Sequence, residues 1–135
     1  MEELSDKIFG KYDIRGAYPL ELNEGAVVEI TKALALQVFK KGTVVLGRDG
    51  RKSSPELYEV AKSVLESFDD IEVVDAGLMT TPMLYFLVND LSASGGIMIT
   101  ASHDIKEHNG IKTVRGGGES GFVSGEEIKE MLDTK

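Results

Sequence analysis

The segment from residue 96 to residue 112 could carry out phosphoryl transfer. An apolar run typical of a buried strand ends at Thr100, and Ser102 and His103 follow it. Lys112 comes ten positions after Ser102. A serine hydroxyl can carry a phosphoryl group when a base or a positive charge lies near it, and an amine can take and return the proton. We therefore expect Ser102, His103 and Lys112 to form the catalytic part of a site.

Each of these residues also has a simpler interpretation when taken alone. A serine at the end of a strand often bonds to its own backbone, and a lysine on an edge strand is often solvated. For the functional interpretation, the Asn-Gly pair at 109–110 is predicted to form a tight turn that returns Lys112 toward Ser102. His103 and His108 lack acidic partners at ligand spacing, so we expect His103 to orient or neutralise a phosphate rather than bind a metal.

Two other segments offer cations for a phosphate. Tyr12 and Arg15 lie in a glycine-bounded segment, residues 10–16, and a guanidinium can contact a phosphate through two hydrogen bonds. Arg48 and Arg51 lie in a polar loop that also holds a carboxylate. We expect all four residues to bind substrate or phosphate. For the arginines of the polar loop, an ion-pair cluster that positions the site is an equally strong interpretation.

The elements that must position these residues alternate between strands and helices. Strands are predicted at 43–46, 71–74, 97–100 and 111–114. The first helix is predicted from Asn23, its N-cap, to before Gly42, and the second has Ser54 as N-cap and Pro55 as first helical residue. The third helix is predicted from Thr81 to about Val88, and the last follows Ser124, which forms a capping box with Glu127. The glycines at 116–118 predict a flexible loop. This order predicts one α/β domain over residues 1–135, with three αβα layers and a mostly parallel (mixed) sheet.

In such folds ligands gather beyond the carboxyl ends of the parallel strands. The segments 47–53, 76–81 and 101–108 would lie at those ends, and two of them carry arginine or histidine. The predicted topology therefore favours one shared site.

Composition narrows the class of protein. The net charge of −8 argues against a nucleic-acid partner, which needs a basic surface. Without cysteine, the chain can form neither disulfides nor a cysteine-ligated zinc site. The first residues lack the pattern of a signal peptide, and no apolar run reaches the length of a membrane span. We therefore expect a cytoplasmic protein that does not bind membranes.

Four segments in the same order resemble motifs of one enzyme family. Residues 9–16 (FGKYDIRG), 47–54 (GRDGRKSS), 76–82 (AGLMTTP) and 100–112 (TASH…NGIK) are similar to the first domain of the α-D-phosphohexomutases, the phosphoglucomutases and phosphomannomutases. The resemblance implies the fold of that first domain, and it implies the activity of the family, which is the interconversion of hexose 1- and 6-phosphates.

The resemblance also implies roles for particular residues. Ser102 would carry the phosphoryl group and Lys112 would be the general acid and base, while Tyr12, Arg15 and His103 would line the site. The phosphate on Ser102 would ligate Mg²⁺, and a hexose 1,6-bisphosphate would supply the phosphoryl group.

Two departures from the family pattern bear on function. Asp104 and Ile105 stand where the family usually has Asn-Pro, which adds an anion beside the expected phosphate. The family has four domains, and this chain has the length of one. We therefore expect the lone domain to be inactive by itself, whether a further polypeptide supplies the missing domains or the chain is a piece of a longer protein, and self-association is another expectation. The alternative is a non-catalytic regulatory module that binds a phosphosugar or a partner protein.

Overall fold

The computed structural model describes residues 4–116 and 121–134, so the last two positions of the predicted loop at 116–118 lie outside the described residues. The elements are η1 (Asp6–Ile8), β1 (Ile14–Ala17), α1 (Glu24–Leu34), η2 (Ala35–Phe39), β2 (Gly42–Arg48), α2 (Ser54–Glu66), β3 (Ile71–Leu78), α3 (Thr81–Asp90), β4 (Gly95–Ile99), β5 (His108–Arg115), β6 (Gly121–Val123) and α4 (Gly125–Asp133). None of the helices in this part of the chain is both long and apolar enough to cross a membrane.

The described residues form one mixed sheet with the order β1-β5-β4-β2-β3, and β6 pairs with β5. The β2 strand is parallel to both β3 and β4, because helical crossovers connect these strands. The β5 strand is antiparallel to β4, β1 and β6. The predicted mixed sheet is confirmed, and its parallel part consists of β3, β2 and β4.

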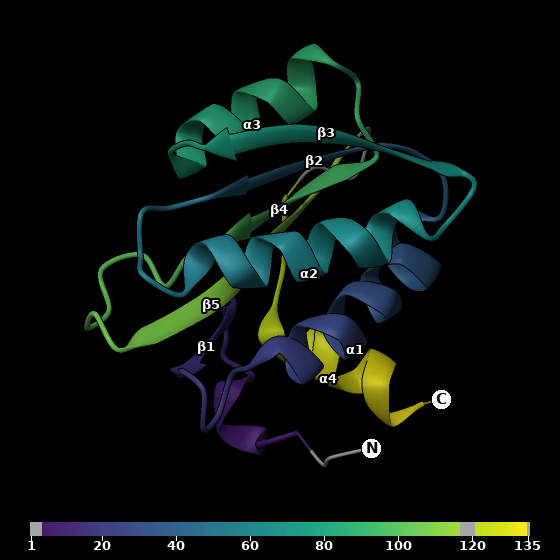
Figure 1. The fold of residues 1–135 in the computed structure, drawn as a ribbon. Coiled ribbons are helices and arrows are strands. Elements are labelled where there is room, and N and C mark those ends of the chain that lie inside the picture. Colours follow the sequence, from purple (N-terminus) through teal and green to yellow (C-terminus); the bar gives the residue numbers. More distant parts are fainter. Residues whose placement is uncertain (1–3, 117–120, 135) are drawn as a thin grey trace.

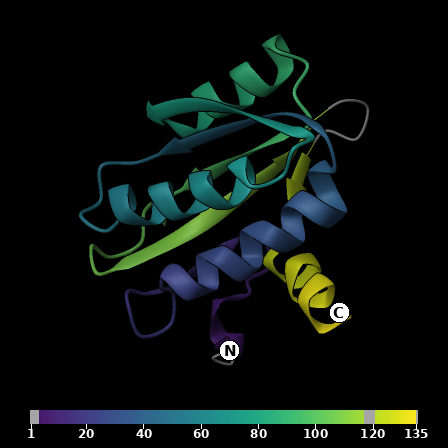
Figure 2. The ribbon, with the colours of Figure 1, turned by 45° about the vertical axis from the view of Figure 1, so that its right-hand side comes forward.

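Helices cover both faces of the sheet, which confirms the three layers (Figure 1). The view in Figure 2 shows α1, α2 and α4 on one side of the sheet and α3 on the other. The larger core lies beneath α1, α2 and α4 and includes Ile97, Ile99 and Ile111 of the sheet. A smaller core, with Met98 and Val114, lies beneath α3. Alternate side chains of β4 and β5 thus enter opposite cores.

Two of the predicted helix starts carry the expected caps. The Asn23 side chain accepts a hydrogen bond from the Ala26 amide at 3.0 Å, and Ser124 and Glu127 form the predicted capping box. Thr80 caps α3, which then begins at Thr81 as predicted. The predicted first helix ends in a π-helical turn, η2.

At the start of α2 the prediction is wrong by one residue. The N-cap is Ser53, and its side chain does not make the capping bond, while Ser54 is the first helical residue. The Ser54 hydroxyl donates instead to the Asp49 carboxylate at 2.6 Å. The hydroxyl predicted to cap the helix therefore holds the loop that precedes it.

The predicted turn at 109–110 is also wrong, because both residues lie inside β5. Asn109 is fully buried, and its amide donates to the hydroxyls of Ser53 and Ser54 at 2.8 and 2.9 Å. Gly110 lies between β1 and β4, where a Cβ would be only 2.2 Å from the Ile14 carbonyl oxygen. The glycine is required by this close approach of strands, not by a turn.

Candidate functional site

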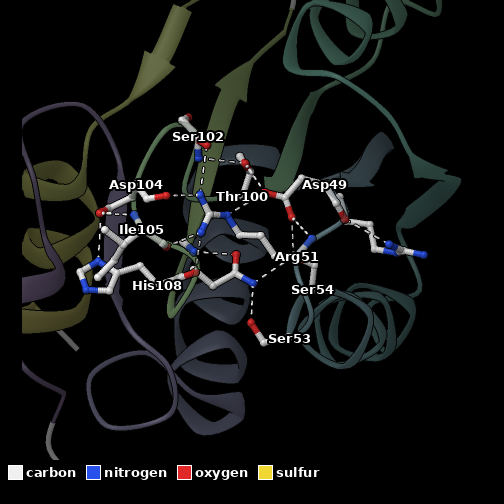
Figure 3. A network of polar contacts seen from close by, with 12 residues as sticks. Asp49, Arg51, Ser53, Ser54, Thr100, Ser102, Asp104, Ile105 and His108 are labelled. Carbon is white, nitrogen blue, oxygen red and sulfur yellow. Dashed lines mark hydrogen bonds and ion pairs between the residues drawn. The ribbon is translucent and has the colours of Figure 1, made fainter.

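Ser102 lies in the loop after β4, and its backbone N–H and carbonyl each form a hydrogen bond. Its N–H donates to the Thr100 hydroxyl at 3.0 Å, and its carbonyl accepts from Arg51 at 3.1 Å. Its φ of 56° lies in the left-handed region, which non-glycine residues rarely adopt. The Ser102 hydroxyl has no hydrogen-bond partner among the described residues and points out of the network in Figure 3. The loop therefore presents this hydroxyl for external contact.

The side chain of Arg51, which comes from the loop between β2 and α2, is surrounded by the loop that carries Ser102 (Figure 3). Its two terminal nitrogens donate to four backbone carbonyls, those of Ser102, Asp104, Ile105 and His108. Its Nε donates to the Asp49 carboxylate at 3.2 Å. A guanidinium has five N–H donors, so every donor of Arg51 is in use. The side chain is 13% exposed. These contacts favour the positioning interpretation of Arg51 that the sequence left open.

Asp49 connects Arg51 to the two segments on either side of it. One carboxylate oxygen accepts from the Arg51 backbone N–H and from the Ser54 hydroxyl. The other accepts from Arg51 Nε and from the Thr100 hydroxyl, at 3.2 and 2.7 Å. Asp49 therefore joins the end of β2, the start of α2 and the end of β4 through one side chain.

Asp104 makes both of its carboxylate contacts within its own loop. One oxygen accepts from the Ile105 N–H at 2.8 Å, and the other lies 3.0 Å from Nδ1 of His108. The hydrogen bond from the Ile105 N–H lowers the pKa of Asp104, with smaller contributions from His108 and from the charge of Arg15. Proline lacks the N–H that Ile105 donates, so Asp104 satisfies a donor that the family's usual Asn-Pro does not have.

Lys112 and Arg15 meet at the carboxylate of Asp13. The Lys112 ammonium lies 2.7 Å from one Asp13 oxygen, and Arg15 donates to both oxygens at 3.0 and 3.1 Å. Asp13 is only 6% exposed. These three side chains come from β5, from β1 and from the residue just before β1, so strand pairing brings them together.

The Asp13 cluster lies on the α3 face of the sheet. Val114 of β5 packs in the α3 core, and Lys112, two residues earlier on the same strand, points to the same face. Burial raises the pKa of Tyr85 in α3, and the charge of Asp13 adds to that shift. In the strand register Lys112 pairs with Met98, four residues before Ser102. Because β5 lies between β1 and β4, Lys112 is not on the edge strand of the simpler interpretation.

The other predicted site residues are held less firmly. Tyr12 is 70% exposed, and His103 is also exposed. Within residues 4–116 and 121–134 neither makes a side-chain hydrogen bond or ion pair. Arg48 donates to the Asp49 carbonyl at 3.1 Å. The structure thus gathers Ser102 with Arg51, and Lys112 with Arg15, while Tyr12 and His103 project freely.

Two residues of this region were not predicted from the sequence, Asp13 and Thr100, whereas Asp49 is the carboxylate of the ion-pair interpretation. Asp13 stands two residues from Arg15, and this spacing was the available signal. No sequence signal identifies Thr100, because its role depends on contact with a loop 51 residues away.

The described residues do not form a metal site by themselves. Among residues 4–116 and 121–134, no three histidine or acidic side chains are grouped so that they could hold a metal ion. Any Mg²⁺ at Ser102 would therefore need ligands beyond those that residues 4–116 and 121–134 group together.

Comparisons with known proteins show the family and the fold of this chain. Residues 6–135 match the model of the family "Phosphoglucomutase/phosphomannomutase, alpha/beta/alpha domain I". The chain is 39% identical over 135 residues to a phosphoglucomutase of Neisseria gonorrhoeae, and 47% identical over 107 residues to the phosphohexose mutases of Xanthomonas campestris. It superposes on the crystal structure of a phosphoglucomutase/phosphomannomutase family protein from Burkholderia thailandensis with a TM-score of 0.82 and 31% identity.

These relatives are much longer than this chain. The match covers 98% of this chain but 28% of the Neisseria protein, and 79% of this chain but 23% of the Xanthomonas protein. In the Burkholderia structure it covers 97% of this chain and 30% of that chain. The family model nevertheless extends over nearly all of the sequence, so the chain belongs to the phosphoglucomutase/phosphomannomutase family and corresponds to its domain I.

Proposed function

We propose that this chain is the phosphoserine-bearing domain of a phosphohexomutase, which interconverts hexose 1- and 6-phosphates in the cytoplasm and needs further domains for turnover. The observation that carries the proposal is the state of Ser102. Its backbone is fixed through both its N–H and its carbonyl, and its hydroxyl is left without a partner among the described residues. A group that must accept and donate a phosphoryl unit needs this combination of fixed position and free oxygen.

The proposed transfer exchanges one P–O bond for another. A hydroxyl of the hexose monophosphate attacks the phosphorus on Ser102, the bond to Oγ breaks, and a hexose bisphosphate forms. Transfer of the other phosphate back to Ser102 gives the isomeric monophosphate. Lys112, in its amine form, would take the proton of the attacking hydroxyl and, as the ammonium, give it to the departing Ser102 Oγ, and the return transfer would reverse these two roles. Arg15, with Tyr12 and His103, would bind the substrate or its phosphate.

The proposal includes Mg²⁺ as an ion that this domain and a further domain would bind together. The phosphate on Ser102 would be one ligand, and the remaining ligands would come from a further domain, because the described residues offer no cluster for them. We expect the lone domain to be inactive because phosphoryl transfer depends on positioning and charge stabilisation, and part of both would come from the further domain. A polypeptide that supplies the remaining domains is the proposed partner, and self-association is a further expectation.

Mass spectrometry of the intact chain tests the proposal. The chain is incubated with glucose 1,6-bisphosphate and Mg²⁺, with and without the Neisseria phosphoglucomutase lacking its own domain I. We expect one phosphoryl group on Ser102 when the additional domains are present, and none in Ser102→Ala. Ser92→Ala is the matched control, because Ser92 also has a positive φ but lies in the turn before β4. Lack of transfer to the unaltered chain under both conditions would refute the proposal.

A second candidate function is a non-catalytic module that binds a phosphosugar or a partner protein. The carboxylate of Asp104, two residues after Ser102, favours it, because an anion there repels a phosphate. This function would not need the Ser102 hydroxyl. Unchanged binding of glucose 1,6-bisphosphate by Ser102→Ala, together with absent transfer in the unaltered chain, would support the module.

A further inference from the structure

The loop after β4 has a conformation that its own sequence does not favour. Ser102 has a φ of 56°, and only Lys40 and Ser92 share a positive φ among the described non-glycine residues. A left-handed serine places its Cβ close to the following carbonyl, so neighbouring contacts must hold it there. The contacts that do so come from a segment about fifty residues earlier in the chain.

Arg51 supplies most of these contacts. Its five donors meet four carbonyls of the loop and the carboxylate of Asp49. Because four carbonyls between residues 102 and 108 point at one cation, the loop backbone must curve around the guanidinium. The planar fork of an arginine can serve four acceptors at once, whereas the ammonium of a lysine has three donors at a single point.

A second tether reaches Ser102 from the other side. The Thr100 hydroxyl donates to Asp49 at 2.7 Å and accepts the Ser102 N–H at 3.0 Å. Asp49 in turn orients Arg51 through its Nε. One connected network therefore fixes the peptide groups before and after Ser102 and leaves its hydroxyl outside.

We propose that Arg51 is the positioning residue of the phosphoryl-carrying loop: it holds Ser102 in its left-handed conformation and does not bind the substrate phosphate. This inference rests on the proposed function of Ser102. It assigns Arg51 a different role from the phosphate contact expected from sequence, because no donor of its guanidinium is left for a ligand.

The test compares Arg51→Lys with Lys52→Ala. Lys52 is the exposed neighbouring cation, and removing it also alters the charge of this loop. The first readout is the NMR cross-peak between the amide and α protons of Ser102, which is strong when φ is positive. The second is the rate of Ser102 phosphorylation as a function of glucose 1,6-bisphosphate concentration, with the additional domains present.

We expect Arg51→Lys to lose the strong cross-peak and to lower the saturated transfer rate about 100-fold, since a displacement of about 1 Å has an effect of that order. The half-saturating bisphosphate concentration should change little, and Lys52→Ala should match the unaltered chain in both readouts. Thr100→Val, which removes the second tether with little change of shape, should weaken the same cross-peak.

Two results would overturn the inference. One is an unchanged cross-peak and saturated rate in Arg51→Lys. The other is an unchanged cross-peak with a raised half-saturating concentration, which would make Arg51 a phosphate ligand. If the unaltered chain is never phosphorylated, the proposed function fails, and the cross-peak still decides whether Arg51 holds the loop. Circular dichroism of each variant separates loss of loop geometry from loss of the fold.

Discussion

The Lys112 ammonium lies 2.7 Å from the carboxylate of Asp13, and both side chains are largely buried, with 14% and 7% exposed. The same carboxylate also accepts from Arg15. An ion pair removed from water is strongly destabilised when one partner is lost, because the other charge stays buried and uncompensated. Asp13 therefore fixes the position of two cations that the proposed reaction uses.

Asp13→Asn should destabilise the chain by about 3 kcal/mol, as expected when a buried ion pair loses one partner. The free energy of unfolding, measured with urea, checks this value. Asp6→Asn is the control, because the Asp6 side chain is 84% exposed and its oxygen is 3.8 Å from Lys129. A cost for Asp13→Asn no larger than that of the control would show that the buried cluster contributes little.

Gly110→Ala should be strongly destabilising although it adds a single methyl group. The new Cβ would lie 2.2 Å from the Ile14 carbonyl oxygen and 2.8 Å from that of Thr100, so β1 or the end of β4 would have to move. We expect a loss of about 3 kcal/mol in the free energy of unfolding.

The matched control for this prediction is Gly50→Ala, where a Cβ meets nothing within 4 Å. It should leave stability nearly unchanged. Equal stability of the two alanine variants in urea would contradict the close strand approach described at Gly110.

Asn109→Ala should loosen the contact between β5 and the start of α2. Its buried amide donates to the hydroxyls of Ser53 and Ser54, and its side-chain oxygen accepts the Gly110 N–H. Removal leaves buried polar groups without partners, which costs about 2 kcal/mol. Urea unfolding checks the loss, and Asn89→Ala, at an exposed position in α3, should leave stability unchanged.

The sequence predicted the elements that depend on local pattern. Helices with capping residues and a clear apolar face were found within a few residues, as Asn23 and Ser124 illustrate. The strand β1 was missed because its four residues, Ile14–Ala17, are too few to show an alternation. The Asn-Gly pair at 109–110 was misinterpreted because a glycine required by neighbouring strands and a glycine required by a turn look alike in a sequence.

The site was predicted in its residue types more than in its contacts. Ser102 and Lys112 were proposed from their spacing and remain predictions, whereas the partners of Arg51 are carbonyls more than fifty positions away. Backbone carbonyls are present at every residue, so no sequence pattern identifies which of them a guanidinium will meet. The same holds for Asp13 and Lys112, whose side chains meet only because β1 pairs with β5.

The last prediction concerns the dependence of stability on pH through Glu127 of α4. A hydrogen bond from Arg115 at 2.7 Å lowers the pKa of Glu127 below its ordinary value. Its ionised form therefore stabilises the fold above about pH 4.3, and this contribution is lost as the pH falls through the lower pKa of the folded state. Glu127→Gln should cost about 0.5 kcal/mol at pH 6, because the side chain is 43% exposed and water screens the pair.

The difference in unfolding free energy between the unaltered chain and Glu127→Gln should shrink between pH 5 and pH 3, as the carboxylate becomes protonated. Arg115→Leu provides the control, because without the guanidinium the same glutamine substitution should show a weaker dependence on pH. Glutamine at this position can still accept the Ser124 N–H of the capping box, so the helix start is preserved. A difference that stays constant over this range would mean that the Arg115 contact does not act through the charge of Glu127.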